Sequence, residues 1–215
     1  FDMIVKKYKS IQEELHLHVD LDEEFLKIRK IIQNDDSPDY LVSRGEYLTG
    51  KLLAEYLGAK FVDAADVIMF HYDGTIDMKR TSEKLMQHVQ GSEKILIPGF
   101  YGATPNGTIK VMSRGGSDIT GAVLANVVDA DVYENWTDVS GFMVVDPRII
   151  PNPISIPRIT YSELREMSYM GANVLHDDSV FPVREKNIPI NIRNTNEPDH
   201  PGTMIMEDCS EMDKV

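Results

Sequence analysis

The feature that most constrains the fold of this chain is the alternation, beyond residue 57, of short strand-like runs with helical stretches. The strand-like runs are KFVDA, KILIPG, DVYENW and IPINIR. The helical patterns between them cover residues 79–89, 117–128 and 161–175. Strands separated by helices pair in parallel, because each crossover helix returns over a face of the sheet. The sequence therefore predicts a layered α/β fold with parallel strands.

Residues 1–57 carry a helical rather than a strand-like pattern. Apolar residues recur at helical spacing in two segments, which hold Ile4, Val5, Tyr8, Ile11 and Leu15, and then Leu21, Phe25, Ile28 and Ile32. A third helix is expected to start near SPDY, with Asp39 as its cap. Its inward face is expected to carry Leu48, Leu52 and Tyr56. Further along, TPNGTIK predicts a small hairpin with Asn106 and Gly107 in the turn.

Charge and cysteine content limit the partners of the chain. Its 215 residues suffice for one sizeable core, and they carry a formal net charge of −13. That charge disfavours nucleic acid or an anionic membrane as the main partner, so local features would have to hold an anionic ligand. Cys209 is the single cysteine, and the sequence contains neither a membrane-length apolar run nor a secretory h-region. We therefore expect a cytoplasmic protein without an internal disulfide.

The segment MSRGGSDITGAVLANVVDA, residues 112–130, concentrates charged residues and glycines at the start of a predicted helix. Free N–H groups and the positive end of the helix dipole favour an anion at such a place. Arg114 can bind a carboxylate or a phosphate through two parallel hydrogen bonds. Asp118 would instead hold an ammonium group or a metal-bound water. An ordinary turn followed by a capping Ser or Asp would produce the same pattern.

Two further segments carry candidate ligand-binding residues. In NWTDVSGFMVVDPRI, Thr137 and Asp138 lie where a predicted strand ends, which is where open α/β sheets bind ligands. Arg148 follows an Asp-Pro turn, and a turn-rich connection is the alternative interpretation of this segment. In SRGE, Glu46 could bind the ammonium group of a substrate, although an isolated acid on a helix is more often a solvated surface residue.

Taken together, five segments resemble the aspartate kinases, which belong to the amino-acid kinase family. They are GFYG, SRGGSDITGAVLA, WTDVSGFMVVDPR, GANVLH and NTNEPDHPGT, and they follow the order and spacing of that family from about Ser43 to Ile205. The resemblance implies a three-layer αβα sandwich around a mostly parallel sheet. It also implies phosphoryl transfer from ATP, with Mg²⁺, to the β-carboxylate of L-aspartate. The product, 4-phospho-L-aspartate, enters lysine, threonine and methionine biosynthesis.

The resemblance also assigns expected roles to individual residues. Arg114 and Asp118 would be the catalytic pair, with Arg114 on the α-carboxylate of aspartate and Asp118, together with Glu46, on its ammonium group. Phe100 and Ser117 would lie beside this substrate. The residues expected at the nucleotide are Thr137, Asp138, Arg148 and, through its backbone, Val174. Because a carboxylate acceptor is already ionised, catalysis requires alignment and charge neutralisation rather than a general base.

The chain also departs from the family pattern. The family begins with a Lys-Phe-Gly-Gly segment whose lysine reaches the phosphates, and it continues into ACT regulatory domains that build a homodimer. We therefore expect residues 1–206 to be a catalytic domain truncated at its N-terminus, and residues 207–215 to begin a linker. Asn173 and Met143 replace a lysine and a tyrosine of many members. A kinase of glutamate or another small amino acid, and an inactive nucleotide-binding fragment, remain the alternatives.

No metal site made of protein side chains is expected from the sequence. His16 and His18 flank a leucine in HLH and are interpreted as surface residues. The HDD run that starts at His176 is interpreted as a helix end.

Overall fold

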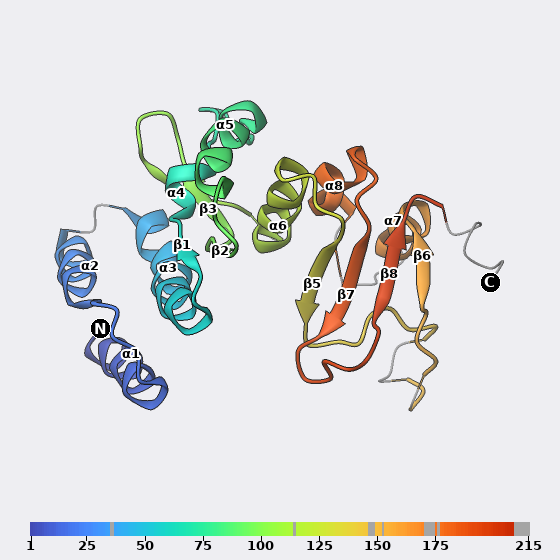
Figure 1. Ribbon diagram of the computed structural model, residues 1–215, viewed down its shortest axis with the longest axis horizontal. Helices are drawn as coiled ribbons and strands as arrows, with labels where there is room; N and C mark the ends of the chain where they lie inside the picture. Colours follow the sequence, from blue (N-terminus) through green and yellow to red (C-terminus); the bar gives the residue numbers. More distant parts are fainter. Residues whose placement is uncertain are drawn as a thin grey trace. The chain divides into compact units, whose positions relative to one another are not determined.

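The computed structural model describes residues 1–34, 37–113, 115–145, 149–151, 153–169, 175 and 177–208. The chain divides into two compact units, Phe1–Gly116 and Ser117–Val215. The first unit is rich in helices, and the second is centred on a sheet of four strands (Figure 1). None of the helices in the described part of the chain is long and apolar enough to cross a membrane.

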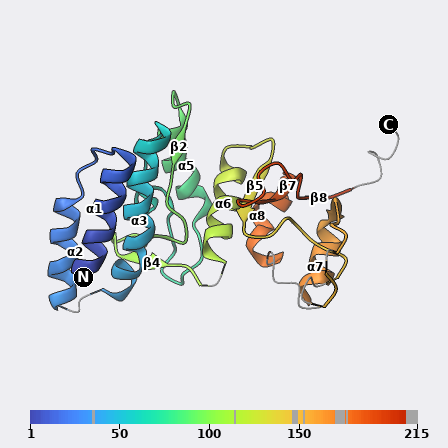
Figure 2. The ribbon, with the colours of Figure 1, turned by 90° about the horizontal axis from the view of Figure 1, so that it is seen from below.

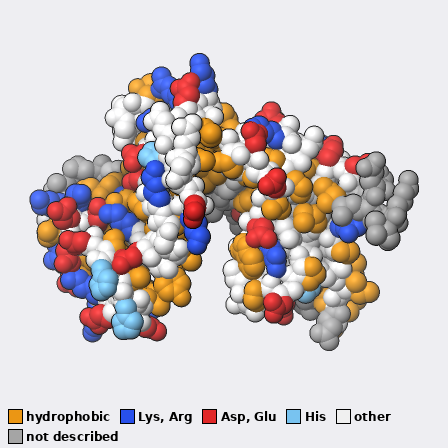
Figure 3. Space-filling view, in the orientation of Figure 1, with side chains coloured by type: hydrophobic (Ala, Val, Ile, Leu, Met, Phe, Trp, Pro, Cys, Tyr) orange, Lys and Arg blue, Asp and Glu red, His pale blue; other side chains and the backbone are white. Residues whose placement is uncertain are grey.

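Three helices open the first unit, as the sequence predicts: α1 (Asp2–Leu15), α2 (Asp22–Asn34) and α3 (Pro38–Leu57). They lie together in both views of the ribbon (Figures 1 and 2), and the Phe25 ring of α2 lies 6.2 Å from the Tyr8 ring of α1. Their buried residues include Phe25, Ile28, Leu48 and Leu52, and Leu21, directly before α2, is buried with them. Acidic and basic side chains are intermixed on the face of α1 and α2 seen in Figure 3, as is usual for solvated helix surfaces.

Two details of the third helix differ from the prediction. Ser37 is the N-cap and Pro38 begins the helix, whereas the Asp39 carboxylate accepts a hydrogen bond at 3.1 Å from the backbone N–H of Val111. The expected Asp39 cap is therefore wrong, because a distant strand takes its carboxylate. Tyr56 is 58% exposed rather than inward. An α-helix drifts by about 40° every four residues, so a stripe that starts at Leu48 has left the core face by Tyr56.

The rest of the first unit alternates short strands and helices. The elements are β1 (Lys60–Phe61), α4 (Ala64–Val67), α5 (Met78–Val89), β2 (Ile95–Leu96), β3 (Tyr101–Ala103) and β4 (Ile109–Val111). Strands β1 and β2 pair in parallel, whereas β3 and β4 form an antiparallel hairpin. The hairpin predicted around Asn106 is confirmed, with Gly107 at a φ of 82° in its turn.

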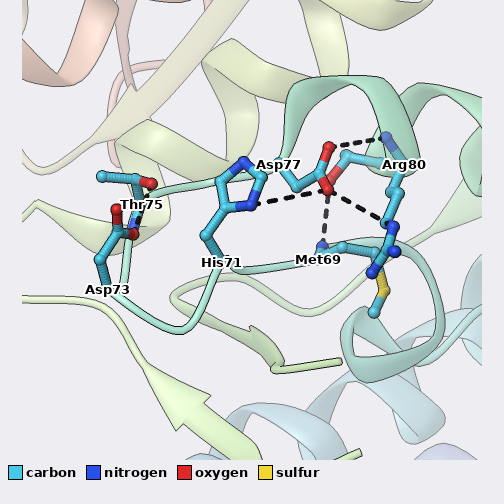
Figure 4. A network of polar contacts seen from close by, with 7 residues as sticks. Met69, His71, Asp73, Thr75, Asp77 and Arg80 are labelled. Carbon is cyan, nitrogen blue, oxygen red and sulfur yellow. Dashed lines mark hydrogen bonds and ion pairs between the residues drawn. The ribbon is translucent and has the colours of Figure 1, made fainter. Parts of the chain in front are cut away.

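The loop before α5 is held by carboxylates (Figure 4). Asp77 caps the helix by accepting a hydrogen bond from the Arg80 N–H at 3.0 Å, and its second oxygen lies 3.8 Å from Nδ1 of His71. Asp73 accepts hydrogen bonds from the N–H and the hydroxyl of Thr75, at 2.9 and 2.7 Å. These contacts fix the direction from which the chain enters α5.

The second unit is built on a mixed sheet with the strand order β5-β7-β8-β6 (Figure 1). Its elements are α6 (Gly116–Val127), β5 (Tyr133–Thr137), β6 (Arg158–Thr160), α7 (Tyr161–Tyr169), the 3-10 helix η1 (Asp177–Val180), α8 (Phe181–Glu185), β7 (Ile190–Asn194) and β8 (Thr203–Met206). Strand β5 is parallel to β7, as predicted. Strands β6 and β8 were not predicted; they are parallel to each other, whereas β7 and β8 are antiparallel. That pair is a hairpin without a crossover helix.

One face of this sheet carries the core of the second unit. Ile159, Ile190, Ile192 and Ile205 pack there against side chains of α6, α7 and α8. Figure 2 shows α7 and α8 on the same side of the strands. The helix predicted at 161–175 is confirmed as far as Tyr169, and residues 170–174 lie outside the described residues.

A half-buried carboxylate, that of Glu24, joins α2 to α3 and should make the first unit sensitive to acid. Glu24 accepts hydrogen bonds at 3.0 Å from both the Tyr47 hydroxyl and the Lys51 ammonium. Burial by itself would raise the pKa of Glu24, but these two bonds and the nearby positive charges hold the pKa below its ordinary value of 4.5. A carboxylate with a depressed pKa stabilises the fold above its unfolded pKa, and that contribution is lost as the pH falls through its folded pKa.

We therefore expect the wild-type protein to lose more unfolding free energy than Glu24→Gln when the pH falls from neutral to below 4.5. Urea unfolding at several pH values measures this difference. The exposed neighbour Glu23 on the same helix provides the control, since Glu23→Gln should follow the wild-type pH dependence. Equal acid sensitivity of the wild type and Glu24→Gln would contradict the assignment.

Candidate functional site

In the first unit the structure brings the GFYG segment and the Gly-Gly turn together. Phe100 has a left-handed φ of 62°, and its carbonyl accepts a hydrogen bond at 2.7 Å from the N–H of Met112. A Cβ placed on Gly116 would lie 2.9 Å from Cβ of Phe100 and 2.7 Å from Cβ of Met112. Only glycine leaves room for this contact. Phe100 is thus fixed against the turn that opens α6.

Glu46 lies on an exposed part of α3, and the same helix is anchored by the buried Arg44. The Arg44 guanidinium carbon lies 4.3 Å from the ring centroids of both Tyr40 and Tyr47 and 5.4 Å from that of Tyr101. Tyr101 immediately follows Phe100. The helix that carries Glu46 is therefore held against the strand that follows Phe100, through stacking of a cation on aromatic rings.

Asp118 lies in the first turn of α6 and is held by side chains of β5 in the second unit. Its Oδ1 accepts a hydrogen bond at 2.9 Å from Nδ2 of Asn135. The same amide donates to the Tyr133 hydroxyl at 3.0 Å, and that hydroxyl donates to the Asp118 carbonyl at 3.4 Å. Burial raises the pKa of Tyr133 to about 12, so the phenol is neutral at physiological pH. Ser117, the residue before Asp118, is exposed.

The roles of Asn135 and Tyr133 were not predicted from the sequence. The sequence did contain one relevant indication. Residues 133, 135 and 137 are every second residue of the predicted strand, so their side chains point to the same face of it. The distance to Asp118 depends on how α6 packs on β5, and the strand pattern does not contain that information.

A second polar group lies at the carboxyl ends of the parallel strands β5 and β7. The Thr137 carbonyl accepts hydrogen bonds from the N–H and the hydroxyl of Thr195, at 2.8 and 3.0 Å. The Thr137 hydroxyl donates to the carboxylate of Asp138, which is exposed, at 3.3 Å. The structure therefore brings the predicted pair next to the NTNE segment, at the sheet edge where α/β folds bind ligands.

Next to the carboxyl ends of β5 and β7 lies a partly buried series of hydrogen bonds that was not predicted from the sequence. The side-chain amide of Asn194 donates to Oγ of Ser140 at 2.8 Å, and Ser140 in turn donates to the Glu197 carboxylate. Ser140 and Asn194 are buried and hold the two loops together. Their partners lie more than fifty residues away in the sequence, so neither motif by itself indicated the pairing.

The opposite face of β5 carries Trp136. The Arg193 guanidinium carbon lies 4.8 Å from the centre of its indole ring, and the indole N–H donates to Glu134 at 3.1 Å. This stack covers the outward side of the strand that ends at Thr137. The contact with Arg193 holds the indole ring of Trp136 in place, although the Trp136 side chain is 43% exposed.

Three predicted site residues, Arg114, Arg148 and Val174, lie outside the described residues. Within the part of the chain that the structure describes, no group of three or more His, Cys, Asp or Glu side chains is arranged to hold a metal ion. In the second unit, the described candidate groups are thus a carboxylate held in place on α6 and hydroxyl and amide groups at the carboxyl ends of β5 and β7. In the first unit, a phenylalanine is held at a glycine turn. Charged and polar groups of these kinds can donate and accept hydrogen bonds to a polar ligand.

Comparisons with known proteins agree with this chemistry. Residues 2–194 match the protein-family model described as the amino acid kinase family. Aspartokinase 3 of Bacillus subtilis is 34% identical over 222 residues, which cover 95% of this chain and 48% of that protein. The bifunctional aspartokinase/homoserine dehydrogenase of Buchnera aphidicola is 32% identical, over 99% of this chain and 29% of its own length. The chain thus spans about half the length, or less, of these curated relatives.

Solved structures are similar over nearly the whole chain. Aspartate kinase of Clostridium acetobutylicum superimposes with a TM-score of 0.92 and 51% identity, over 98% of this chain and 48% of that one. Aspartokinase III of E. coli, solved with aspartate and ADP, has a TM-score of 0.85 and 27% identity, over 98% of this chain and 52% of that one. The α/β fold class expected from the sequence is confirmed by these likenesses.

Proposed function

The chain belongs to the amino acid kinase family, and we propose that it forms part of an aspartate kinase. The reaction would be transfer of the γ-phosphoryl group of ATP to the β-carboxylate of L-aspartate. The observation that carries this proposal is the likeness over 98% of the chain to a structure solved with both aspartate and ADP. The position of Asp118 in the first turn of α6 adds support, because a fixed carboxylate is suited to an ammonium group.

The proposed acceptor site uses residues from both sides of the Gly-Gly turn. Arg114 would bind the α-carboxylate of aspartate, and Asp118 with Glu46 would bind its ammonium group. Phe100 and Ser117 would lie beside the substrate. The packing of Phe100 against Gly116 supports the part of this assignment that lies in the first unit, since it holds the GFYG segment against the Gly-Gly turn.

The proposed nucleotide site uses Thr137, Asp138 and Arg148, with Val174 contributing through its backbone. The hydrogen bonds between Thr137 and Thr195 support it, because they set the polar pair at the carboxyl end of a parallel strand. Mg²⁺ would enter bound to the phosphates of ATP, which is the usual mode for this ion.

The proposed reaction needs no proton transfer from the protein. The β-carboxylate of aspartate is ionised at neutral pH, and one of its oxygens forms a bond to the γ-phosphorus. The bond from that phosphorus to the bridging oxygen of ADP breaks, and ADP leaves with the electron pair. The protein contributes alignment of the two substrates and neutralisation of charge on the transferring group.

The pathway, the compartment and the assembly are part of the same proposal. A relative whose name joins aspartokinase to homoserine dehydrogenase supports a role in amino-acid biosynthesis, leading to lysine, threonine and methionine. A cytoplasmic homodimer is what the family resemblance suggests.

Trapping with hydroxylamine tests the reaction and the acceptor together. Hydroxylamine converts an acyl phosphate into a hydroxamate and inorganic phosphate, and the hydroxamate is coloured with ferric ion. With Mg·ATP, we expect hydroxamate from aspartate and none from glutamate above the blank. Product from glutamate alone would indicate a kinase of a different acceptor. Nucleotide binding without product from either acid would contradict catalysis by this chain and would favour the alternative of an inactive nucleotide-binding fragment.

A further inference from the structure

We propose that Asn135 is a positioning residue, which with Tyr133 orients the Asp118 carboxylate toward the ammonium group of the acceptor amino acid. The inference rests on the proposed function and adds a determinant of acceptor specificity to it. It concerns residues of the second unit alone.

The geometry fixes one oxygen of the carboxylate and leaves its charge in place. Asn135 donates one hydrogen bond to Oδ1 of Asp118 at 2.9 Å and another to the Tyr133 hydroxyl at 3.0 Å. The two donors of this amide are therefore engaged. Holding Oδ1 also fixes the direction of Oδ2, since the carboxylate is planar. A neutral amide does this without neutralising Asp118, whereas a lysine or arginine in its place would compete with a substrate ammonium group.

The support behind Asn135 is rigid. Tyr133 and Asn135 lie on β5, which pairs with β7 along its whole length in parallel register. A Cβ on Gly121 would lie 2.5 Å from the Tyr133 hydroxyl oxygen and 2.7 Å from its ring. Helix α6 therefore approaches the tyrosine as closely as a glycine allows, one turn after Asp118. Tyr133 closes the arrangement by donating to the Asp118 carbonyl at 3.4 Å.

This arrangement would select for an acceptor that carries an amino group. A carboxylate that is already oriented loses little conformational freedom when an ammonium group binds. A dicarboxylic acid without the amino group, such as succinate, would leave the Asp118 charge unpaired and would be repelled by it. Asn135 should therefore affect the binding of aspartate and not the binding of succinate.

The test compares Asn135→Leu with the wild type in the purified protein. We expect the KM for aspartate to rise by about tenfold, because one hydrogen bond to a charged group is lost. The KM for ATP and the inhibition constant of succinate should each change by less than about twofold. In an Asp118→Asn background the same replacement should add less than about twofold, because the two residues act as one unit.

Two further variants test the inference if Asn135→Leu folds poorly. Tyr133→Phe retains the ring that packs on Gly121 and loses only the hydroxyl, and it should raise the KM for aspartate more than the KM for ATP. Asn135→Thr retains a donor on a strand-compatible side chain and should recover part of the loss. The control is Glu134→Gln on the outward face of β5, where the carboxylate contacts Trp136 and Arg193, and this variant should leave the KM for aspartate unchanged.

The possible outcomes are distinguishable. A variant at residue 135 that weakens succinate and aspartate equally, or that lowers kcat with both KM values unchanged, overturns the inference and leaves the proposed function standing. Absence of aspartate-dependent turnover in the wild type removes catalysis of the proposed reaction by this chain, and the inference with it.

Discussion

Replacing Asp118 by alanine should lower kcat/KM for aspartate by about 100-fold or more and leave the affinity for ATP within about twofold. The truncation removes a carboxylate that is held at 2.9 Å by Asn135, and it would leave the ammonium group of aspartate without its partner. The loss of one member of a desolvated charge pair costs about 3 kcal/mol, which corresponds to this change in rate constant. Steady-state kinetics with aspartate varied at saturating Mg·ATP measures the effect.

Asp131 provides the matched control for this experiment. It is an exposed aspartate of the same unit, between α6 and β5, and Asp131→Ala should retain the wild-type kinetics. Thermal unfolding of both variants separates a loss of function from a loss of fold. Wild-type turnover of aspartate by Asp118→Ala would refute the assignment of this residue to the acceptor site. A weakened affinity for ATP with an unchanged KM for aspartate would instead move the residue to the nucleotide.

Replacing Gly202 by alanine should destabilise the second unit by about 3 kcal/mol or more. Gly202 has a φ of 73°, and a Cβ built on it would lie only 1.8 Å from the carbonyl oxygen of Ile192 on the neighbouring strand. Relief of that overlap must move β8 away from β7. The next residue, Thr203, would move with it, and its hydroxyl donates to the Ile156 carbonyl at 2.6 Å and accepts from the Phe142 N–H at 2.8 Å.

The variant Gly107→Ala is the control for Gly202→Ala. It separates the destabilisation caused by steric overlap from the destabilisation caused by a positive φ at a non-glycine residue. The φ of Gly107 is 82°, but nothing lies within 4 Å of a Cβ built on it, so Gly107→Ala should cost only about 1 kcal/mol. Urea unfolding of the two variants, each against the wild type, gives the comparison. Equal losses at the two positions would show that the close approach at Ile192 is relaxed at little cost, contrary to the prediction.

The sequence predicted most elements of the fold, because each depends on a local pattern. The three opening helices of the first unit, the hairpin at Gly107 and the parallel pair β5–β7 follow from local patterns. Strands β6 and β8 are only three and four residues long and were not predicted. Two expectations failed for different reasons. Asp39 does not cap its helix because Val111, 72 positions away, takes its carboxylate. The expected parallel pairing fails between β7 and β8 because the loop that joins them contains no crossover helix.

The candidate site also contains residues that were predicted from the sequence and residues that were not. Motifs predicted Asp118, Phe100 and Thr137 as individual residues, and the structure gives each of them a defined position. The residues that hold them were not predicted, because their contacts join separate elements. Asn135 reaches Asp118 across 17 positions, and Asn194 reaches Ser140 across 54. Residues that support a site in this way match no local sequence motif, so they can be identified only from the packed structure.

Trp136 has a practical consequence for every experiment on the second unit. It is the single tryptophan of the chain, and its indole is stacked on Arg193 one residue before Thr137. The intrinsic fluorescence of the chain under selective excitation of tryptophan therefore comes from one point, at the carboxyl end of β5. A titration with nucleotide or a urea melt observed in this emission reports on that strand without an added dye. The chain carries its own optical probe beside the proposed ATP site.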